Sequence, residues 1–223
     1  MSAGRTPGTG GAARTDSAQA GPSALVELRG VSKSWGERHV LRDVSFVFRA
    51  GETWVISGRS GTGKSTLLNL VAGYVEPDAG EIVRPARVGY LLQDDILMSG
   101  LTASQNVRVA GAAAPSVDLD DRVRRALDAV GIGHRADVPV EYLSGGERRR
   151  VEFASLLVGD LPVVLFDEPT ASLDPQTRGE VADTINAVFS EKLCIVVSHD
   201  ESFQHELSDA WGLRLREGTL SDR

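Results

Sequence analysis

The segment 58–65, Gly-Arg-Ser-Gly-Thr-Gly-Lys-Ser, constrains the fold of this chain more than any other stretch of its sequence. It lies between the short apolar run 53–57 and the helical pattern 64–72, which predicts a strand, a glycine-rich loop and a helix in that order. In such a loop the backbone N–H groups can turn towards phosphate oxygens, and the helix N-terminus adds the positive end of its dipole. We expect Lys64 to reach the β- and γ-phosphates of a nucleotide and the Ser65 hydroxyl to bind Mg²⁺.

A second motif ends in two neighbouring carboxylates, Asp167 and Glu168. The preceding run 163–166 is continuously apolar, which predicts a central parallel strand that is buried on both faces. Ligands of open α/β sheets bind at the carboxyl edge of such strands, where both acids should emerge. We expect Asp167 to hold Mg²⁺ through water and Glu168 to polarise an attacking water as a general base. An exposed acidic strand end is the plain alternative, but the two motifs together are typical of a P-loop NTPase.

The rest of the chain alternates between strand and helix patterns, which predicts an α/β fold. Further strands are expected at 25–28, 40–48, 87–92, 193–197, 211–215 and 219–220, and further helices at 118–130, 145–158 and from 175 towards 189. Ser144 is the expected N-cap of the helix at 145–158, and the pair Asp174-Pro175 is the expected start of the last helix.

The first residues of the chain, 1–23, have a different composition from the remainder. They are rich in Gly, Ala, Ser, Thr and Pro, and they contain no Val, Ile, Leu, Phe, Tyr or Trp. Such a segment cannot bury enough apolar surface to offset the entropy cost of ordering it. We therefore expect a disordered tail at 1–23, with a targeting arm as the alternative, and a folded domain at 24–223.

Composition narrows the possible partners and surroundings. The net charge of −7 argues against a nucleic-acid partner. The single cysteine, Cys194, excludes an internal disulfide and lies in an apolar run, where we expect a buried, unreactive thiol in an intracellular protein. No apolar run approaches the roughly 20 residues needed to cross a bilayer, and no signal peptide opens the chain. If the protein works at a membrane, another chain must supply the membrane-spanning segment.

A third motif, Leu-Ser-Gly-Gly-Glu at 143–147, opens a helix shortly before the Asp-Glu strand. Small residues at a helix N-terminus form an anion site, and a chain that already has a phosphate loop needs a second nucleotide or a second chain to fill it. With this motif the sequence resembles the ABC ATPase family over residues 24–220, with Glu147 where glutamine is more usual. The resemblance implies a P-loop NTPase core with a mostly parallel sheet, an N-terminal antiparallel β subdomain and an inserted α-helical signature subdomain at about 99–160.

Four further segments match motifs of this family in the expected order. Trp35 stands where the family places an aromatic side chain, commonly tyrosine, that stacks on adenine. Gln93 matches the Q-loop, which contacts Mg²⁺ and water and senses the transmembrane partner. Ser172-Leu173-Asp174 matches the D-loop, and His199 matches the switch histidine near the γ-phosphate. Each residue alone would more often be structural, so the assignment depends on their joint order and spacing.

The resemblance implies ATP and Mg²⁺ as cofactors and assigns a role to each matched residue. The expected ATP-binding residues are Trp35, Gly58, Arg59, Ser60, Gly61, Thr62, Gly63, Lys64, Ser65 and Thr66. The expected catalytic residues are Lys64, Gln93, Glu168 and His199, and the expected metal-binding residues are Ser65, Gln93 and Asp167. The residues expected to bind the ATP of a partner chain are Ser144, Gly145, Gly146 and Glu147. The run 148–150, three arginines, is expected to be a solvated helix start.

The resemblance also implies a mode of action. Two ATPase chains would form a head-to-tail dimer, homomeric or heteromeric, with ATP between Lys64 of one chain and the 143–147 motif of the other. Transmembrane permease subunits would be the partners, and the chain would be cytoplasmic, peripheral on the inner face of the cell membrane. No nucleic-acid partner is expected. The implied function is ATP hydrolysis that powers transport.

Two alternative functions fit the sequence less well than transport does. A non-transport ABC ATPase acting on a ribosome or DNA complex usually has two cassettes in one chain or long coiled-coil insertions, and this sequence has neither feature. A catalytically inactive regulatory cassette conflicts with the complete set Lys64, Glu168 and His199. The short segment between 72 and 93 resembles compact single-cassette systems such as lipoprotein-release or efflux ATPases, with metal importers close behind.

Overall fold

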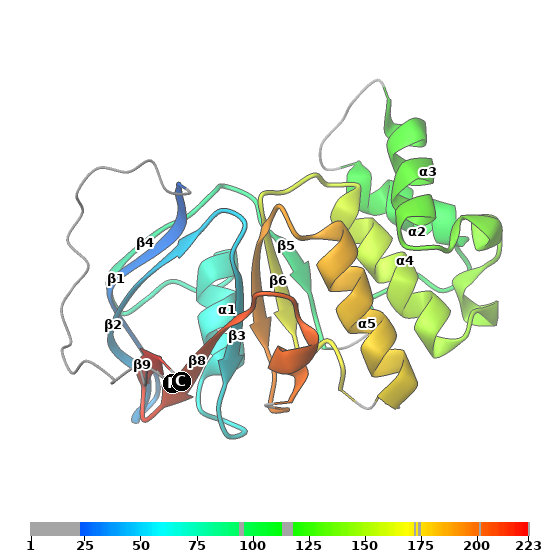
Figure 1. The fold of residues 1–223 in the computed structure, drawn as a ribbon. Coiled ribbons are helices and arrows are strands. Elements are labelled where there is room, and N and C mark those ends of the chain that lie inside the picture. Colours follow the sequence, from blue (N-terminus) through cyan, green and yellow to red (C-terminus); the bar gives the residue numbers. More distant parts are fainter. Residues whose placement is uncertain are drawn as a thin grey trace, which may run out of the picture.

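Two β-sheets organise the chain (Figure 1). The computed structural model describes residues 23–93, 96–112, 118–171, 173, 175–200 and 202–222. The expected disordered tail therefore lies, apart from Ser23, outside the described residues. The smaller sheet is antiparallel with the strand order β2-β1-β4, and its strands are β1 (Ala24–Trp35), β2 (Arg38–Arg49) and β4 (Ala79–Val83).

The larger sheet is the mostly parallel core that the sequence predicts. Its strand order is β5-β6-β7-β3-β8-β9, and every neighbouring pair is parallel except β8 and β9. This order places β3 and β6 on either side of β7, so the phosphate loop and the Asp-Glu motif start from strands with one strand between them. The strands are β3 (Thr53–Ser57), β5 (Gly89–Leu91), β6 (Val163–Asp167), β7 (Leu193–Val197), β8 (Trp211–Arg216) and β9 (Thr219–Asp222).

Helices cover both faces of the larger sheet (Figure 1). Helix α1 lies between the two sheets, whereas α5 and α4 cover the opposite face, and α2 and α3 pack beyond α4. The helices are α1 (Lys64–Ala72), α2 (Ala103–Gly111), α3 (Leu119–Ala129), α4 (Gly145–Leu157) and α5 (Pro175–Val188). Short 3₁₀ turns are η1 (Gly133–Arg135), η2 (Val140–Tyr142) and η3 (Phe203–Glu206).

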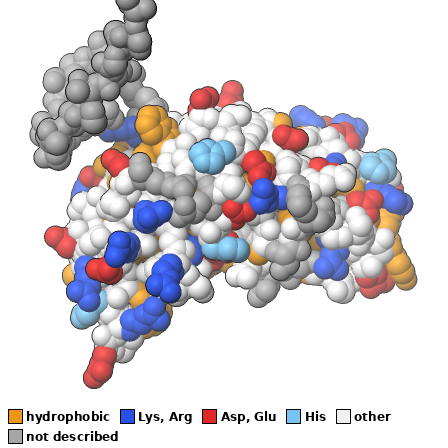
Figure 2. Space-filling view, turned by 60° about the horizontal axis from the view of Figure 1, so that its bottom comes forward, with side chains coloured by type: hydrophobic (Ala, Val, Ile, Leu, Met, Phe, Trp, Pro, Cys, Tyr) orange, Lys and Arg blue, Asp and Glu red, His pale blue; other side chains and the backbone are white. Residues whose placement is uncertain are grey.

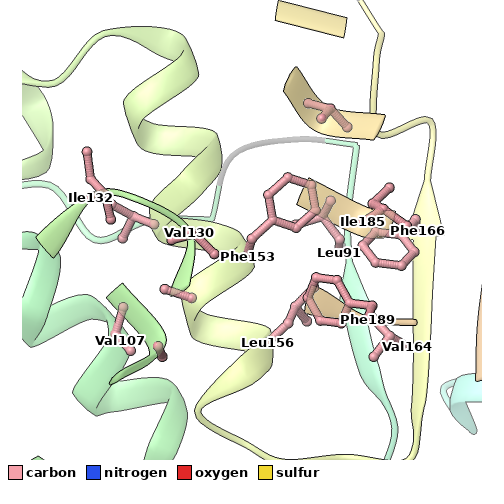
Figure 3. Close-up of a cluster of buried hydrophobic side chains, with 14 of the residues drawn as sticks. Leu91, Val107, Val130, Ile132, Phe153, Leu156, Val164, Phe166, Ile185 and Phe189 are labelled. Atoms are coloured by element: carbon pink, nitrogen blue, oxygen red, sulfur yellow. The ribbon is translucent and has the colours of Figure 1, made fainter. Parts of the chain in front are cut away.

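Separate hydrophobic clusters lie on the two faces of the larger sheet, because side chains alternate along each strand. In β6, Val163 and Leu165 join the cluster that includes α1, whereas Val164 and Phe166 join the cluster that includes α4 and α5. Figure 3 shows the second cluster, in which Phe153 of α4 lies near Phe166 of β6 and near Phe189, which follows α5. Every residue of β6 and β7 is buried, as expected for central parallel strands.

Most expected elements are present, and two observed elements were missed. The predicted bounds of β3 and α1 are those observed. The missed strand β4 is a largely exposed edge strand without an apolar pattern. The missed helix α2 begins at a capping box, in which the Thr102 hydroxyl accepts a hydrogen bond from the Gln105 N–H and the Gln105 side chain accepts one from the Thr102 N–H. The strand expected at 25–28 continues through β-bulges to Trp35.

Two expectations from composition concern the thiol and the membrane. Cys194 is completely buried in β7, and this burial raises the pKa of its thiol to about 12, which confirms an unreactive cysteine. Within the part of the chain that the structure describes, no helix has the length and apolar character required to span a bilayer.

Truncation of Phe153 to alanine should lower the free energy of unfolding by about 3–5 kcal/mol, the usual cost of removing a buried aromatic ring. The ring centroid lies 5.9 Å from that of Phe166 and 6.0 Å from that of Phe189, so the substitution leaves a cavity inside a packed cluster. Urea denaturation followed by circular dichroism measures the loss. The control is Tyr142→Ala, which removes a side chain that is 75% exposed and should cost less than about 0.5 kcal/mol. Equal losses would contradict this packing.

Candidate functional site

The loops that follow β3, β6 and β7 meet at the carboxyl ends of these parallel strands, at the bottom of Figure 1. They contribute to one cleft of about 450 Å³. Figure 2 shows this side of the molecule, where Lys and Arg side chains gather over part of the face with acidic side chains among them. The cleft is lined by Trp35, Arg38, Val40, Ser60, Gly61, Gly63, Lys64, Ser65, Thr66, Gln93, Glu168, Ala171 and His199.

Two positions of the phosphate loop, residues 58–63, require glycine, one because of close packing and the other because of its backbone conformation. A Cβ atom on Gly58 would lie 2.6 Å from a backbone carbonyl oxygen of β8, a distance that real side chains do not reach. Gly63, which precedes α1, has a φ of 106°, a conformation that residues with side chains rarely adopt. Thr62 stabilises the loop from within, because its backbone N–H and its hydroxyl donate to the Arg59 carbonyl at 3.2 and 2.9 Å.

Lys64 begins α1, and its ammonium group lies within the curve of the phosphate loop. Its Nζ donates to the Gly58 carbonyl at 2.8 Å and lies 3.4 Å from the Arg59 carbonyl. It is also 3.9 Å from Oε1 of Glu168. The side chain is only 7% exposed, so this cation is held by neutral carbonyls and one carboxylate in a place that phosphate oxygens could occupy.

Ser65 and Asp167, the two expected metal-binding residues outside the Q-loop, contact one another. The Ser65 hydroxyl donates to Oδ1 of Asp167 at 3.2 Å, although the residues belong to α1 and β6. Oδ2 of Asp167 accepts a hydrogen bond from the Tyr90 hydroxyl at 3.4 Å, a contact that sequence reasoning missed. Burial raises the pKa of Asp167, and the hydrogen bond from Ser65 partly opposes this shift.

Glu168 and His199 form a second contact between the ends of neighbouring strands. Oε2 of Glu168 accepts a hydrogen bond from the His199 backbone N–H at 3.1 Å. The same oxygen is hydrogen-bonded with the imidazole Nδ1 of His199 at 2.8 Å. The carboxylate side chain is 13% exposed, whereas the histidine side chain is 66% exposed. The expected base and the expected switch histidine are thus adjacent, and the histidine faces the open side of the cleft.

Trp35 stands at the rim of the cleft, at the end of β1. Its side chain is 53% exposed, and its indole Nε1 donates to the Thr66 hydroxyl of α1 at 3.3 Å. Nζ of Lys33 lies 5.2 Å from the ring centroid and also pairs with Asp78 at 2.7 Å. An edge contact and a cation over the ring therefore hold the indole in place while about half of its surface remains open to a ligand.

The remaining predicted residues fall into three groups. Ser60, Gly61 and Gln93 line the cleft, and Gln93 also lines an adjoining pocket together with Glu168. Gly58, Arg59 and Thr62 shape the phosphate loop without lining the cleft. Of the expected D-loop, Leu173 is described and lines the second cleft, whereas its two neighbours in the motif lie outside the described residues.

The Leu-Ser-Gly-Gly-Glu motif lies in a second cleft of about 560 Å³ that shares no lining residue with the first. Ser144 caps α4 as predicted: its hydroxyl accepts a hydrogen bond from the Glu147 N–H at 3.3 Å, and Oε2 of Glu147 accepts one from the Ser144 N–H at 2.9 Å. Nε of Arg135 donates to Oε1 of Glu147 at 3.1 Å. The backbone hydrogen bond from Ser144 and the charge of Arg135 lower the pKa of Glu147. Gly145 and Gly146 line the same cleft.

The expectation that the arginines at 148–150 form a solvated helix start is wrong for Arg149. The side chain of Arg149 is only 11% exposed and pairs with the buried carboxylate of Glu152 at 2.8 Å. It also donates to the Pro169 carbonyl at 2.9 Å, beside Glu168. The helix start thus contacts the loop that follows β6 in the same chain, a contact between distant segments that local sequence cannot reveal.

The described residues fit Mg²⁺ better than a metal enclosed by protein ligands. No group of three or more His, Cys, Asp or Glu side chains within the described ranges is placed to hold a metal ion. Mg²⁺ usually keeps several waters and takes one or two protein oxygens together with substrate phosphates. The Ser65 hydroxyl and the Asp167 carboxylate, which meet beside the phosphate loop, are such a pair.

Comparison with known proteins agrees with this site. The family model described as ABC transporter matches residues 41–171. The chain is 37% identical over 201 residues to the aliphatic sulfonates import ATP-binding protein SsuB 2 of Paracoccus denitrificans, which covers 89% of this chain and 80% of that protein. It is 37% identical over 153 residues to the cytochrome c biogenesis ATP-binding export protein CcmA of Gluconobacter oxydans. This match covers 69% of this chain and 70% of that protein.

A solved structure with the same fold is the dimeric post-hydrolysis state of the ATP-binding cassette MJ0796 bound to ADP and Pi. Its TM-score is 0.74 at 26% identity, and the match covers 89% of this chain and 98% of that chain. Fold and site together thus define a P-loop ATPase cassette of the ABC type. The chain belongs to the ABC transporter family and is an ATP-binding, ATP-hydrolysing transporter subunit.

Replacing Trp35 with alanine should weaken ATP binding roughly two- to tenfold, because aromatic stacking contributes about 0.5–1.5 kcal/mol. Trp35→Tyr should nearly restore the affinity, since it keeps a ring at the rim of the cleft. Equilibrium binding of ATP to the purified protein measures both effects. Trp211→Ala, which removes an indole that is 59% exposed and outside the cleft, is the matched control and should bind ATP normally. Unchanged affinity in Trp35→Ala would assign Trp35 a structural role only.

Proposed function

We propose that this chain binds ATP with Mg²⁺ in the cleft beside the phosphate loop and hydrolyses it there. The observation that carries the proposal is the convergence of Lys64, Ser65 and the Glu168–His199 pair in one cleft, with Asp167 hydrogen-bonded to Ser65 behind it. Loop amides, the α1 N-terminus and Lys64 would bind the phosphates. Bound Mg²⁺, held by Ser65, Asp167 and Gln93, would offset the negative charge that develops on the phosphoryl group.

The chain's own residues supply the proton chemistry in this proposal. The Glu168 carboxylate is nearly enclosed, and donors from His199 hold one of its oxygens, so its orientation is set before a nucleotide arrives. The other oxygen, Oε1, faces Lys64 and the phosphate loop. Glu168 would accept a proton from the water that attacks the γ-phosphate. His199, exposed at the mouth of the cleft, would contact the γ-phosphate.

A head-to-tail dimer would complete each site. The Leu-Ser-Gly-Gly-Glu motif is built as an anion site at the start of α4, yet it lines a cleft distinct from that of Lys64. Two copies in head-to-tail arrangement would bring Ser144, Gly145 and Gly146 of one chain to the nucleotide of the other. The dimeric state of the similar cassette bound to ADP and Pi supports this arrangement. ATP would then hold the two chains together until hydrolysis releases them.

A groove between β5, α2 and α4 would receive the transmembrane subunit. It has a volume of about 320 Å³, and its lining is largely apolar. Ile96, Met98 and Val109 border it and are 58%, 51% and 47% exposed. Exposed apolar side chains around a groove are typical of protein interfaces, and a short helix of a permease is the partner of matching shape. The inserted helical subdomain, about 99–160, would carry one side of this groove, with Val109 and Leu156, and the segments around β5 would carry the other. The chain would lie on the cytoplasmic face of the membrane.

The short segment between residues 72 and 93 favours a small transport system of the lipoprotein-release or efflux type, with metal importers as the next candidates. Among the similar proteins, one is named for import of aliphatic sulfonates and one for export in cytochrome c biogenesis. The shared cassette therefore serves both directions, and we assign the choice of cargo to the transmembrane subunits.

Glu168→Gln should keep ATP binding and lose about 10²–10⁴-fold in hydrolysis, because an amide cannot take the proton from water. Since ATP then persists, this variant should form a dimer with ATP and a monomer without it. Size-exclusion chromatography with light scattering measures the mass, and phosphate release measures turnover. Near-normal turnover would remove Glu168 from the role of general base.

Adding Ser144→Arg to Glu168→Gln tests whether the second cleft builds the site. The long side chain would occupy the place of the partner's γ-phosphate, so the ATP-dependent dimer should disappear. Tyr142→Arg in the same background is the matched control, because Tyr142 precedes the motif and does not line the second cleft. A dimer that tolerates Ser144→Arg would rule out the head-to-tail arrangement.

Val109→Asp should abolish association with the transmembrane partner and leave the ATPase activity of the isolated chain unchanged. An isolated charge at the edge of an apolar interface is costly to bury. Tagged chains purified from detergent-extracted membranes, followed by mass spectrometry of membrane proteins retained, measure the effect. Val83→Asp on β4, where Val83 is 42% exposed and outside the groove, is the matched control. Retention of ribosomes or DNA instead of a membrane protein would favour the non-transport alternative.

A further inference from the structure

Arg38 lies in the candidate ATP cleft although it belongs to none of the motifs that identify the family here. It begins β2, and the ladder between β1 and β2 pairs it directly with Trp35. The two residues are joined by the turn Gly36-Glu37, in which Gly36 has a φ of 59°. A tight hairpin thus presents an aromatic ring and a guanidinium group side by side at the rim of the cleft.

The alternation of side chains along β2 directs Arg38 into the cleft. Residues two apart in a strand share a face, and Val40 lines the same cleft. The residue between them, His39, pairs instead with the Ser34 hydroxyl at 2.8 Å on β1. The orientation of Arg38 is therefore a consequence of strand register.

The guanidinium group of Arg38 lies over the middle of the phosphate loop. Its Nη2 donates a hydrogen bond to the Gly61 carbonyl. A Cβ atom added to Gly61 would lie 3.2 Å from the same Nη2, which shows how closely the side chain covers this residue. Backbone contact with the phosphate loop brings the positive charge to the loop whose N–H groups would bind phosphate.

The charges that line the cleft give Arg38 a distinct role. Among the described residues that line it, apart from His199, the charged side chains are those of Arg38, Lys64 and Glu168. Lys64 and Glu168 are 3.9 Å apart and offset one another. No carboxylate within the described ranges forms an ion pair with Arg38. Since Mg²⁺ neutralises only part of the charge of a triphosphate, a second cation in the cleft has an electrostatic purpose.

We propose that Arg38 is a nucleotide-binding residue whose guanidinium group contacts the phosphate chain of ATP. A planar guanidinium donates two parallel hydrogen bonds to a phosphate, which the ammonium of Lys64 cannot do. The β1–β2 hairpin would then contact the nucleotide twice: Trp35 would stack on the base, and Arg38 would bind the phosphates. This inference rests on the proposed ATP site and adds a phosphate ligand to it.

Calorimetric titration of ATP and adenosine into the wild type, Arg38→Gln and Arg38→Lys tests the proposal. Arg38→Gln should weaken ATP binding roughly tenfold, a loss limited by the exposure of the side chain to water. Arg38→Lys should recover part of the affinity, because it keeps the charge and loses the paired donors. Adenosine should bind all three proteins equally. Added salt should weaken ATP binding more in the wild type than in Arg38→Gln.

Arg42→Gln is the matched control, since it removes a positive charge from the same strand outside the cleft and should leave ATP affinity unchanged. Unaltered ATP affinity in Arg38→Gln would overturn the proposal. Equal weakening of ATP and adenosine would also overturn it, because Arg38 would then only brace the phosphate loop. A wild type that does not bind ATP at all would instead refute the proposed function on which this inference rests.

Discussion

The functional clefts depend on the burial of β6 and β7 on both faces of the larger sheet. Every residue of these strands is buried, so polar side chains can emerge only where the strands end. Asp167 is the last residue of β6 and Glu168 follows it, while His199 comes shortly after β7. The parallel ladder pairs Asp167 with Val197, so these ends meet at one edge of the sheet. The same edge receives the phosphate loop from β3, and the candidate catalytic residues are adjacent because these parallel strands all end there.

This arrangement places carboxylates where water is scarce, and nearby donors compensate for the lost hydration. Burial raises the pKa of Asp167, and the Ser65 and Tyr90 hydroxyls act in the opposite direction. Glu168 lies between Lys64 and the donors of His199. These contacts hold the groups in position, but they leave two acids close together beside one buried cation. A divalent cation bound by Ser65 and Asp167 would offset this local negative charge, in agreement with the proposed site for ATP with Mg²⁺.

The sequence predicts the elements that depend on local pattern and misses the contacts that depend on the fold. The phosphate loop, α1 and the apolar strands are visible because glycine spacing, caps and hydrophobic runs are local signals. The Thr102–Gln105 capping box of α2 was also a local signal and could have been found. Arg38 and Tyr90 were missed for another reason: each contacts a segment distant in sequence, Gly61 and Asp167. Only the strand order of the two sheets brings these pairs together.

The backbone at Glu168 and Pro169 connects the candidate ATP cleft with helix α4. The φ of 49° at Glu168 is unusual for a residue with a side chain and costs of order 1–3 kcal/mol. The Glu168 N–H donates to the Val197 carbonyl at 2.9 Å, and Arg149 of α4 donates to the carbonyl of the next residue, Pro169. Helix α4 therefore supports the base of its own chain, while Ser144 at its start would face the nucleotide of the partner. In the proposed dimer, a displacement of α4 on closure would reach both sites, since one rigid helix contacts each of them.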